Sequence, residues 1–209
     1  MGTSGRGIQG GRGLRGPLVL ALMMAAPYLA VLLFWAVGRN AWLTILAYHA
    51  QILLWLLLTR PVLSFKKPSW SPLSLMVVPS ALSAPLLYFV LPLVTRIDLS
   101  AWLAGHRLSG AALVGMVGYY GLVHPVLEQL HWTPLREQTP LAHVAFAGYH
   151  MIVLSSLLSL PWLAVCFGTL VTASLLWQRL TREAGSLVPA VASHVAADLG
   201  MVIVAVLLS

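Results

Sequence analysis

Two acidic residues, Glu128 and Asp198, lie within long apolar stretches of the chain, and each follows a histidine by four residues. That interval puts His124 with Glu128, and His194 with Asp198, on one face of a helix. His150 lies in a third apolar stretch. A carboxylate beside imidazoles can move protons or bind a metal ion. Because ionisable groups are costly inside a membrane, these residues indicate a functional site.

The composition shows what kind of protein must position these residues. Of 209 residues, 59% are hydrophobic and 8% are charged, whereas about 25% of residues are charged in ordinary soluble domains. Disorder of the whole chain is excluded by the same numbers. The net charge of +7 comes from basic residues in short loops between apolar segments. This pattern is typical of membrane topology signals, so lipid is the expected partner and nucleic acid is not.

Seven apolar segments are each about long enough to cross a bilayer as a helix. The sequence therefore predicts an all-α, polytopic transmembrane helix bundle. We divide it into a disordered, basic cytoplasmic tail (1–16), N-terminal transmembrane helices (17–108) and a core that carries the polar residues (109–209). The seven segments are 17–37, 41–63, 72–95, 109–131, 140–158, 160–177 and 186–208.

The distribution of Lys and Arg predicts the orientation. Nine lie in the N-terminal tail and in alternate loops, with Arg136 assigned to the fourth loop, and three lie in the remaining loops. This bias predicts a cytoplasmic N-terminus and an external C-terminus. We expect an integral protein of a bacterial plasma membrane. Glu128, His150 and His194 would then lie in the cytoplasmic half of the bilayer.

Three short motifs follow one another in the last four apolar segments, within residues 109–208. They are EQLHWT from Glu128, FAGYH ending at His150, and HVAAD from His194 to Asp198. They resemble the EExxxR, FxxxH and HxxxN/D motifs of the CPBP family. Its members are the CAAX-protease and bacteriocin-processing (ABI) intramembrane metalloproteases. The resemblance implies a four-helix catalytic core within the predicted bundle.

The first motif departs from the family pattern at two positions. Gln129 replaces the second Glu, and Thr133 stands where the family has Arg. Glu128, which matches the first Glu of the motif, is retained. The departures leave open a non-catalytic relative that keeps the fold as a binding or assembly protein.

The resemblance implies a metalloendopeptidase that hydrolyses a membrane-associated peptide, for example a prenylated or leader peptide. Glu128 would be the general base, and Asp198 would help to position or polarise the reacting groups. His150 and His194 would bind one divalent metal, with zinc expected and Glu128 as a candidate third ligand, or would orient the water and the tetrahedral intermediate. The supporting residues are Gln129, His131, His124 and Phe146.

Two further readings remain. Glu128 and His131 have the spacing of carboxylate-bridged di-iron helices, which would suit a metal-dependent oxidoreductase, although a second such pair is absent. Intramembrane histidines and acids can also relay protons in a transporter, but the chain shows no internal repeat. His49 and His143 are interpreted as structural hydrogen-bonding residues.

Overall fold

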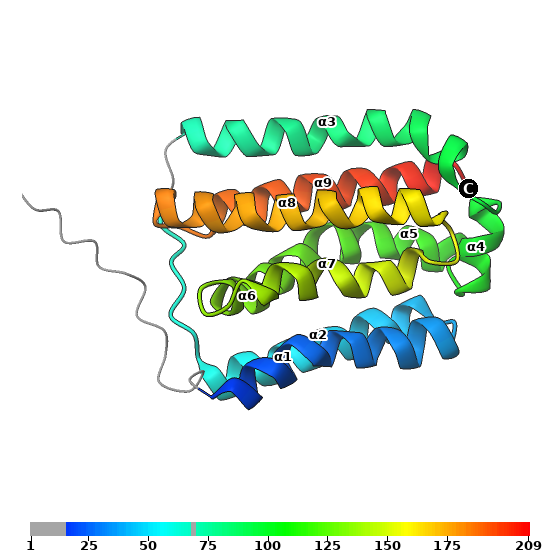
Figure 1. Ribbon diagram of the computed structural model, residues 1–209. Helices are drawn as coiled ribbons and strands as arrows, with labels where there is room; N and C mark the ends of the chain where they lie inside the picture. The colour runs from blue at the N-terminus through cyan, green and yellow to red at the C-terminus, as the bar shows by residue number, and fades with distance from the viewer. Residues whose placement is uncertain (1–15, 68–69) are drawn as a thin grey trace, which may run out of the picture.

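The computed structural model describes residues 16–67 and 70–209, and Figure 1 shows its helices lying roughly parallel to one another. These residues form helices joined by short connections, with no strand among them. The predicted all-α bundle is therefore confirmed. The predicted tail falls on residues 1–15, which lie outside the described part, and on Gly16.

Each of the seven predicted apolar segments contains a helix. A short additional helix, α4, was not predicted. Two helices continue through π-helical stretches, η1 and η2, which often mark functional sites. The elements are α1 (Pro17–Ala30), η1 (Val31–Val37), α2 (Ala41–Thr59), α3 (Trp70–Val94), α4 (Leu99–Gly105), α5 (Gly110–Gly118), η2 (Tyr119–Val123), α6 (His124–Arg136), α7 (Leu141–Leu154), α8 (Leu160–Ala184) and α9 (Val188–Leu207).

Six helical spans in the described part are long and apolar enough to cross a membrane. The chain is therefore an integral membrane protein. Helix α7 is shorter than the predicted segment 140–158, because it ends at Leu154 after 14 residues. At 1.5 Å per residue it measures about 21 Å, less than the roughly 30 Å of a hydrocarbon core.

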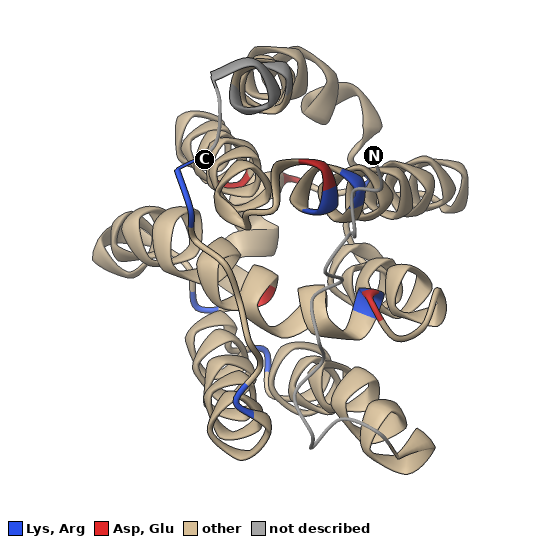
Figure 2. Cartoon of the chain, turned by 90° about the vertical axis from the view of Figure 1, so that its left-hand side faces the viewer, with Lys and Arg blue, Asp and Glu red and all other residues tan. Residues whose placement is uncertain are grey.

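The outside of the bundle is apolar, with leucines exposed along most helices. In the end-on view of Figure 2 most of the ribbon carries no charged residue. Helix α3 is the most peripheral element, and it packs mainly on α9. A methyl group added at Gly200 of α9 would lie 2.7 Å from the Ala84 side chain. Small residues thus allow these two helices to approach closely.

Helix α6 crosses the centre of the bundle and contacts α2, α7 and α9. Its polar residues Glu128, Gln129, His131 and Arg136 are all buried. The assignment of Arg136 to a loop was wrong. It is the last residue of α6 and only 3% exposed, because it packs over the Phe146 ring, with its guanidinium carbon 5.2 Å from the ring centroid.

Candidate active site

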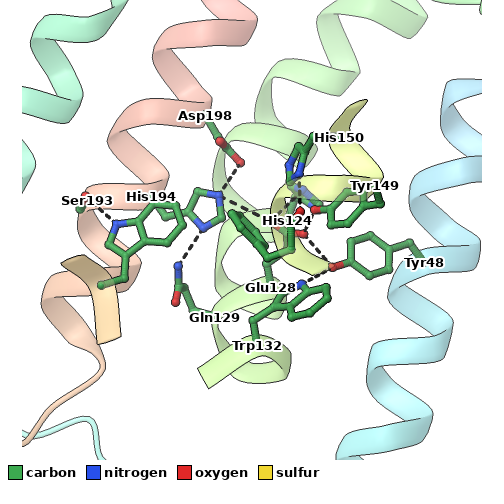
Figure 3. Close-up of polar contacts among 12 residues, drawn as sticks. Tyr48, His124, Glu128, Gln129, Trp132, Tyr149, His150, Ser193, His194 and Asp198 are labelled. Atoms are coloured by element: carbon green, nitrogen blue, oxygen red, sulfur yellow. Dashed lines mark hydrogen bonds and ion pairs between the residues drawn. The ribbon is translucent and has the colours of Figure 1, made fainter. Parts of the chain in front are cut away.

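Glu128 of α6 is fully buried, and its carboxylate is held from two neighbouring helices (Figure 3). Tyr48 of α2 donates to Glu128 Oε1 at 2.7 Å, and Tyr149 of α7 donates to the same oxygen. The Tyr48 hydroxyl in turn accepts from Trp132 Nε1 at 2.8 Å. Hydrogen bonds to an ionised oxygen are the strong ones. The two tyrosines therefore stabilise the Glu128 carboxylate.

The other oxygen of Glu128 faces two histidines. Glu128 Oε2 lies 3.4 Å from His124 Nε2 and 3.5 Å from His194 Nε2. His194 Nε2 also lies 3.4 Å from Asp198 Oδ2. Neither Glu128 Oε2 nor Asp198 Oδ2 has a hydrogen bond of normal geometry. The structure thus brings these four residues together on α6 and α9, with one histidine on each side of Glu128.

The contacts of His194 Nδ1 decide which of its nitrogens carries the proton. Gln129 Nε2 lies 3.1 Å from His194 Nδ1, and Gln129 Oε1 accepts from Arg136 Nη1 at 2.9 Å. An arginine only donates, so it fixes the amide with its oxygen toward the guanidinium and its NH₂ toward the ring. His194 Nδ1 is then an acceptor. We therefore assign the ring proton to Nε2, where it points at the two carboxylates.

Aromatic side chains hold this arrangement in place. The His194 ring stacks on Trp177 of α8, with centroids 4.3 Å apart, and Trp177 Nε1 donates to Ser193 Oγ at 3.0 Å. The guanidinium carbon of Arg136 lies 5.2 Å from the Phe146 ring centroid and 5.6 Å from that of Trp177. The faces of these rings attract a cation. Phe146 and Trp177 therefore help to keep Arg136 buried beside Gln129.

His150 has the opposite ring polarity to His194. Its Nδ1 donates to the Phe146 carbonyl at 2.8 Å, and its ring stacks on Tyr149 with centroids 4.0 Å apart. A carbonyl only accepts, so Nδ1 carries the proton and Nε2 presents a lone pair. His150 thus lies beside the Glu128 cluster through Tyr149, as an acceptor rather than a donor.

The geometry tests the metal site that the family resemblance implied. An imidazole binds zinc through a nitrogen lone pair, whereas His194 Nε2 carries the ring proton. The set of His150, His194 and Glu128 therefore does not fit zinc in this arrangement. A Glu at position 129 would accept a hydrogen bond from His194 Nδ1 and leave Nε2 with a lone pair. Gln129 instead donates to Nδ1, so the ring proton of His194 lies on Nε2.

Two histidines that the sequence pointed to lie away from Glu128. His131 Nε2 donates to the Met23 carbonyl of α1 at 3.2 Å. His131 thus faces a different helix, and the Glu128-x-x-His131 pair of the oxidoreductase reading does not converge on one site. His143 contacts Ser174 Oγ at 2.8 Å and Gln178 Oε1 at 3.1 Å. These contacts join α7 to α8, which suits its structural interpretation.

The sequence interpretation missed several residues of the cluster. Arg136 follows Gln129 by seven residues, so helical spacing could have placed both on one face. His49 of α2, interpreted as structural, lies 3.0 Å from His124 Nδ1 through its Nε2. Tyr48 and Tyr149 had no comparable signal, because a tyrosine in an apolar segment is equally suited to the membrane interface.

Comparisons of the chain with protein-family models, with curated proteins and with solved structures gave no match.

Proposed function

We propose that this protein is an intramembrane peptidase that hydrolyses a peptide bond of a membrane-associated peptide, such as a prenylated or leader peptide. The observation that carries the proposal is the Glu128 carboxylate. It is fully buried and lies with one oxygen between His124 Nε2 and His194 Nε2, at 3.4 and 3.5 Å. The three motifs that resemble those of the CPBP family support the same activity.

The cluster supplies the groups that hydrolysis requires. Glu128 Oε2 takes a proton from a water molecule, whose oxygen attacks the peptide carbonyl carbon. His194 Nε2–H donates to the oxyanion that forms, while Asp198 Oδ2 keeps that ring in position. The carbon–nitrogen bond then breaks, and the proton passes from Glu128 to the leaving amine. His150 Nε2 accepts a hydrogen bond from the water or from the peptide N–H.

A peptide must open the bundle to reach this site, because Glu128 is 0% and His194 is 3% exposed. Helix α3 lies at the edge of the bundle and packs mainly on one helix, α9. It contacts α9 at the residue next to His194, where Ser80 Oγ and Ser193 Oγ are 2.8 Å apart. Displacement of α3 would uncover that face of α9 to a peptide lying in the bilayer.

The charge distribution supports the expected orientation. Without the buried Arg136, eight Lys and Arg remain on the side of the N-terminus and three on the other. We infer that the N-terminus is cytoplasmic and the C-terminus external, in a bacterial plasma membrane. The α6 end that carries Arg136 then faces the cytoplasm.

The direct test compares membranes from bacteria that overproduce the wild-type chain, Glu128→Gln or His194→Ala. Mass spectrometry of newly formed peptide N-termini is expected to show a set present with the wild type and absent with both variants. Arg179→Ala, a change at an exposed helix position, is the matched control and should retain the set. Identical N-termini in all four samples would overturn the peptidase proposal.

One observation favours the second candidate, a binding or assembly protein with the same fold. The complete burial of Glu128 suits a structural carboxylate as well as a catalytic one before a peptide enters. In that case the Glu128→Gln chain would be less stable than the wild type, because the hydrogen bonds from Tyr48 and Tyr149 would lose their charged acceptor, and it would yield the same N-termini in the experiment above.

A further inference from the structure

A continuous row of polar contacts leads away from Glu128 on the side of His124. His124 Nδ1 lies 3.0 Å from His49 Nε2, and His49 Nδ1 lies 2.8 Å from the Tyr119 hydroxyl. The row crosses from α6 to α2 and ends on η2. Each side chain in the row has one polar atom directed toward Glu128. The two histidines also have a second ring nitrogen directed away from it.

Hydrogen positions along this row are consistent in a single direction when Glu128 is ionised. His124 Nε2–H points at Glu128 Oε2, at 3.4 Å. His124 Nδ1 then accepts from His49 Nε2–H, and His49 Nδ1 accepts from the Tyr119 hydroxyl. Each group donates toward the carboxylate, and no group has to donate twice.

We infer that Tyr119, His49 and His124 form a proton relay that loads and unloads Glu128. Tyr119 passes its hydroxyl proton to His49 Nδ1 and takes one from water. His49 passes the proton on Nε2 to His124 Nδ1, and His124 passes the proton on its Nε2 to Glu128 Oε2. One proton thus moves from water to Glu128, and both rings change tautomer. The same steps in reverse remove the proton, so neither ring has to rotate.

The least favourable step is the last one. The 3.4 Å between His124 Nε2 and Glu128 Oε2 exceeds the upper end of the normal hydrogen-bond range by about 0.2 Å. A small side-chain movement closes it. Tyr48, Tyr120 and His194 also face His124, with ring centroids 5.8, 4.4 and 6.5 Å from its own. The carboxyl group of Asp198 interacts electrostatically with His124 as well. His194 does not provide an alternative route, because its Nδ1 is held by Gln129.

The relay gives Glu128 a route to another part of the bundle. Tyr119 and Glu128 are nine residues apart on one continuous helical span, which is about 14 Å along the axis. Tyr119 directly follows α5, which lies beside α4 in Figure 1, whereas Glu128 lies within α6, which ends at Arg136. Tyr119 is also partly exposed, whereas His49 and His124 are buried. The relay therefore extends from Glu128 away from Arg136 and ends at its one residue that is not buried.

Two buried histidines in contact could instead serve only to satisfy each other's hydrogen bonds. His49→Gln distinguishes the two roles. A glutamine can still donate to His124, but its amide does not take a proton on one atom and release another. The measurement is time-resolved infrared absorption of the protonated carboxyl group after a pH jump, on the purified full chain in detergent. The signal of Glu128 is identified by its loss in Glu128→Gln, and no peptide substrate is involved.

We expect His49→Gln and Tyr119→Phe to slow protonation of Glu128 by about 10²-fold, the lower range for loss of a positioned proton-transfer group. His143→Gln is the matched control, since His143 is also a buried histidine between two partners, and it should keep the wild-type rate. An unchanged rate in His49→Gln, or equal slowing in His143→Gln, would overturn the relay.

A rescue experiment provides a second readout should His49→Gln fold poorly. His49→Ala leaves a cavity between Tyr119 and His124, which added imidazole can fill. Imidazole is expected to restore the protonation rate, whereas 1-methylimidazole, with one nitrogen blocked, is not. Equal restoration by both compounds would show that filling the cavity is sufficient and would refute proton transfer through His49. None of these outcomes depends on whether the chain cleaves peptides.

Discussion

The two sides of Glu128 carry the same kind of side chain in two different situations. On the α9 side, His194 Nδ1 contacts Gln129, which accepts from Arg136. On the α2 side, His124 Nδ1 contacts His49, which in turn contacts the Tyr119 hydroxyl. Arginine has no acceptor, so the first row has one polarity. Imidazole and hydroxyl groups both donate and accept, so the second row can reverse.

The difference shows that the last group in a row of hydrogen bonds decides whether a buried histidine is a fixed or an exchangeable donor. His194 is a fixed donor toward Glu128 and Asp198, which suits stabilisation of a developing oxyanion. His124 is an exchangeable donor, which suits proton transfer. Exchanging the partners of either ring should therefore exchange its role.

The largest effect is expected from Gln129→Glu, which reverses the direction of the hydrogen bond at His194 Nδ1. A carboxylate at this position accepts from both Arg136 and His194 Nδ1, so the ring proton moves from Nε2 to Nδ1. Nitrogen-15 NMR of the labelled histidine should show the change of tautomer. The variant should also bind about one zinc ion per chain, because a freed Nε2 joins Glu128 and Asp198, whereas the wild type binds none.

Gln138→Glu is the control for this change. It adds the same charge to an exposed residue after the end of α6, and it should alter neither the tautomer nor the zinc content. Retention of the Nε2–H tautomer in Gln129→Glu would contradict the role that we assign to Gln129.

A smaller effect is expected from removing the end of the fixed row with Arg136→Met. Gln129 is then free to turn, and His194 populates both tautomers. The proposed peptide cleavage should fall by about 10–100-fold, the loss that follows removal of an outer hydrogen-bond partner from a metal-ligating histidine. The melting temperature should hold or rise, because Arg136 Nε and Nη2 have no hydrogen-bond partner and burial of an unpaired charge is unfavourable. A parallel fall in activity and stability would indicate a structural role only.

Tyr48→Phe should reduce stability without altering the hydrogen bonds of His194 or those of His124. It removes one donor to Glu128 Oε1 and the acceptor of Trp132 Nε1. Loss of a hydrogen bond to a charged group costs about 1.5–3 kcal/mol. The free energy of unfolding in mixed detergent micelles measures the loss. The same substitution made in Glu128→Gln should cost less, and an equal cost in both backgrounds would show that the charge is not involved.

The smallest effect is expected at the surface. Arg179 and Glu183 form an exposed ion pair one helical turn apart, at 2.7 Å. Such pairs contribute little, because water and salt screen them. Arg179→Ala should leave the melting temperature, the His194 tautomer and the protonation rate of Glu128 unchanged, which makes it the reference against which the other variants are compared.

Much of this arrangement could be predicted from the sequence within single helices. The four-residue intervals of His124 with Glu128 and of His194 with Asp198 correctly placed each pair together. The three-residue interval between Glu128 and His131 did not bring that pair together in one site, because His131 turns toward the Met23 carbonyl on α1. The end of α6 was also misjudged. A charged residue after an apolar run suggested a loop, whereas Phe146 and Trp177 provide aromatic faces that retain Arg136 in the bundle.

The sequence alone determined that the chain is a membrane helix bundle, because length and apolarity decide whether a helix can cross a bilayer. It also determined which polar residues share a helix face, because the helical period is fixed. Only the tertiary structure decided which nitrogen of each histidine carries the proton. That depends on Gln129 and Arg136 for one ring and on His49 and Tyr119 for the other. The rotation and depth of one helix against another follow from packing along their whole length, which no local spacing specifies.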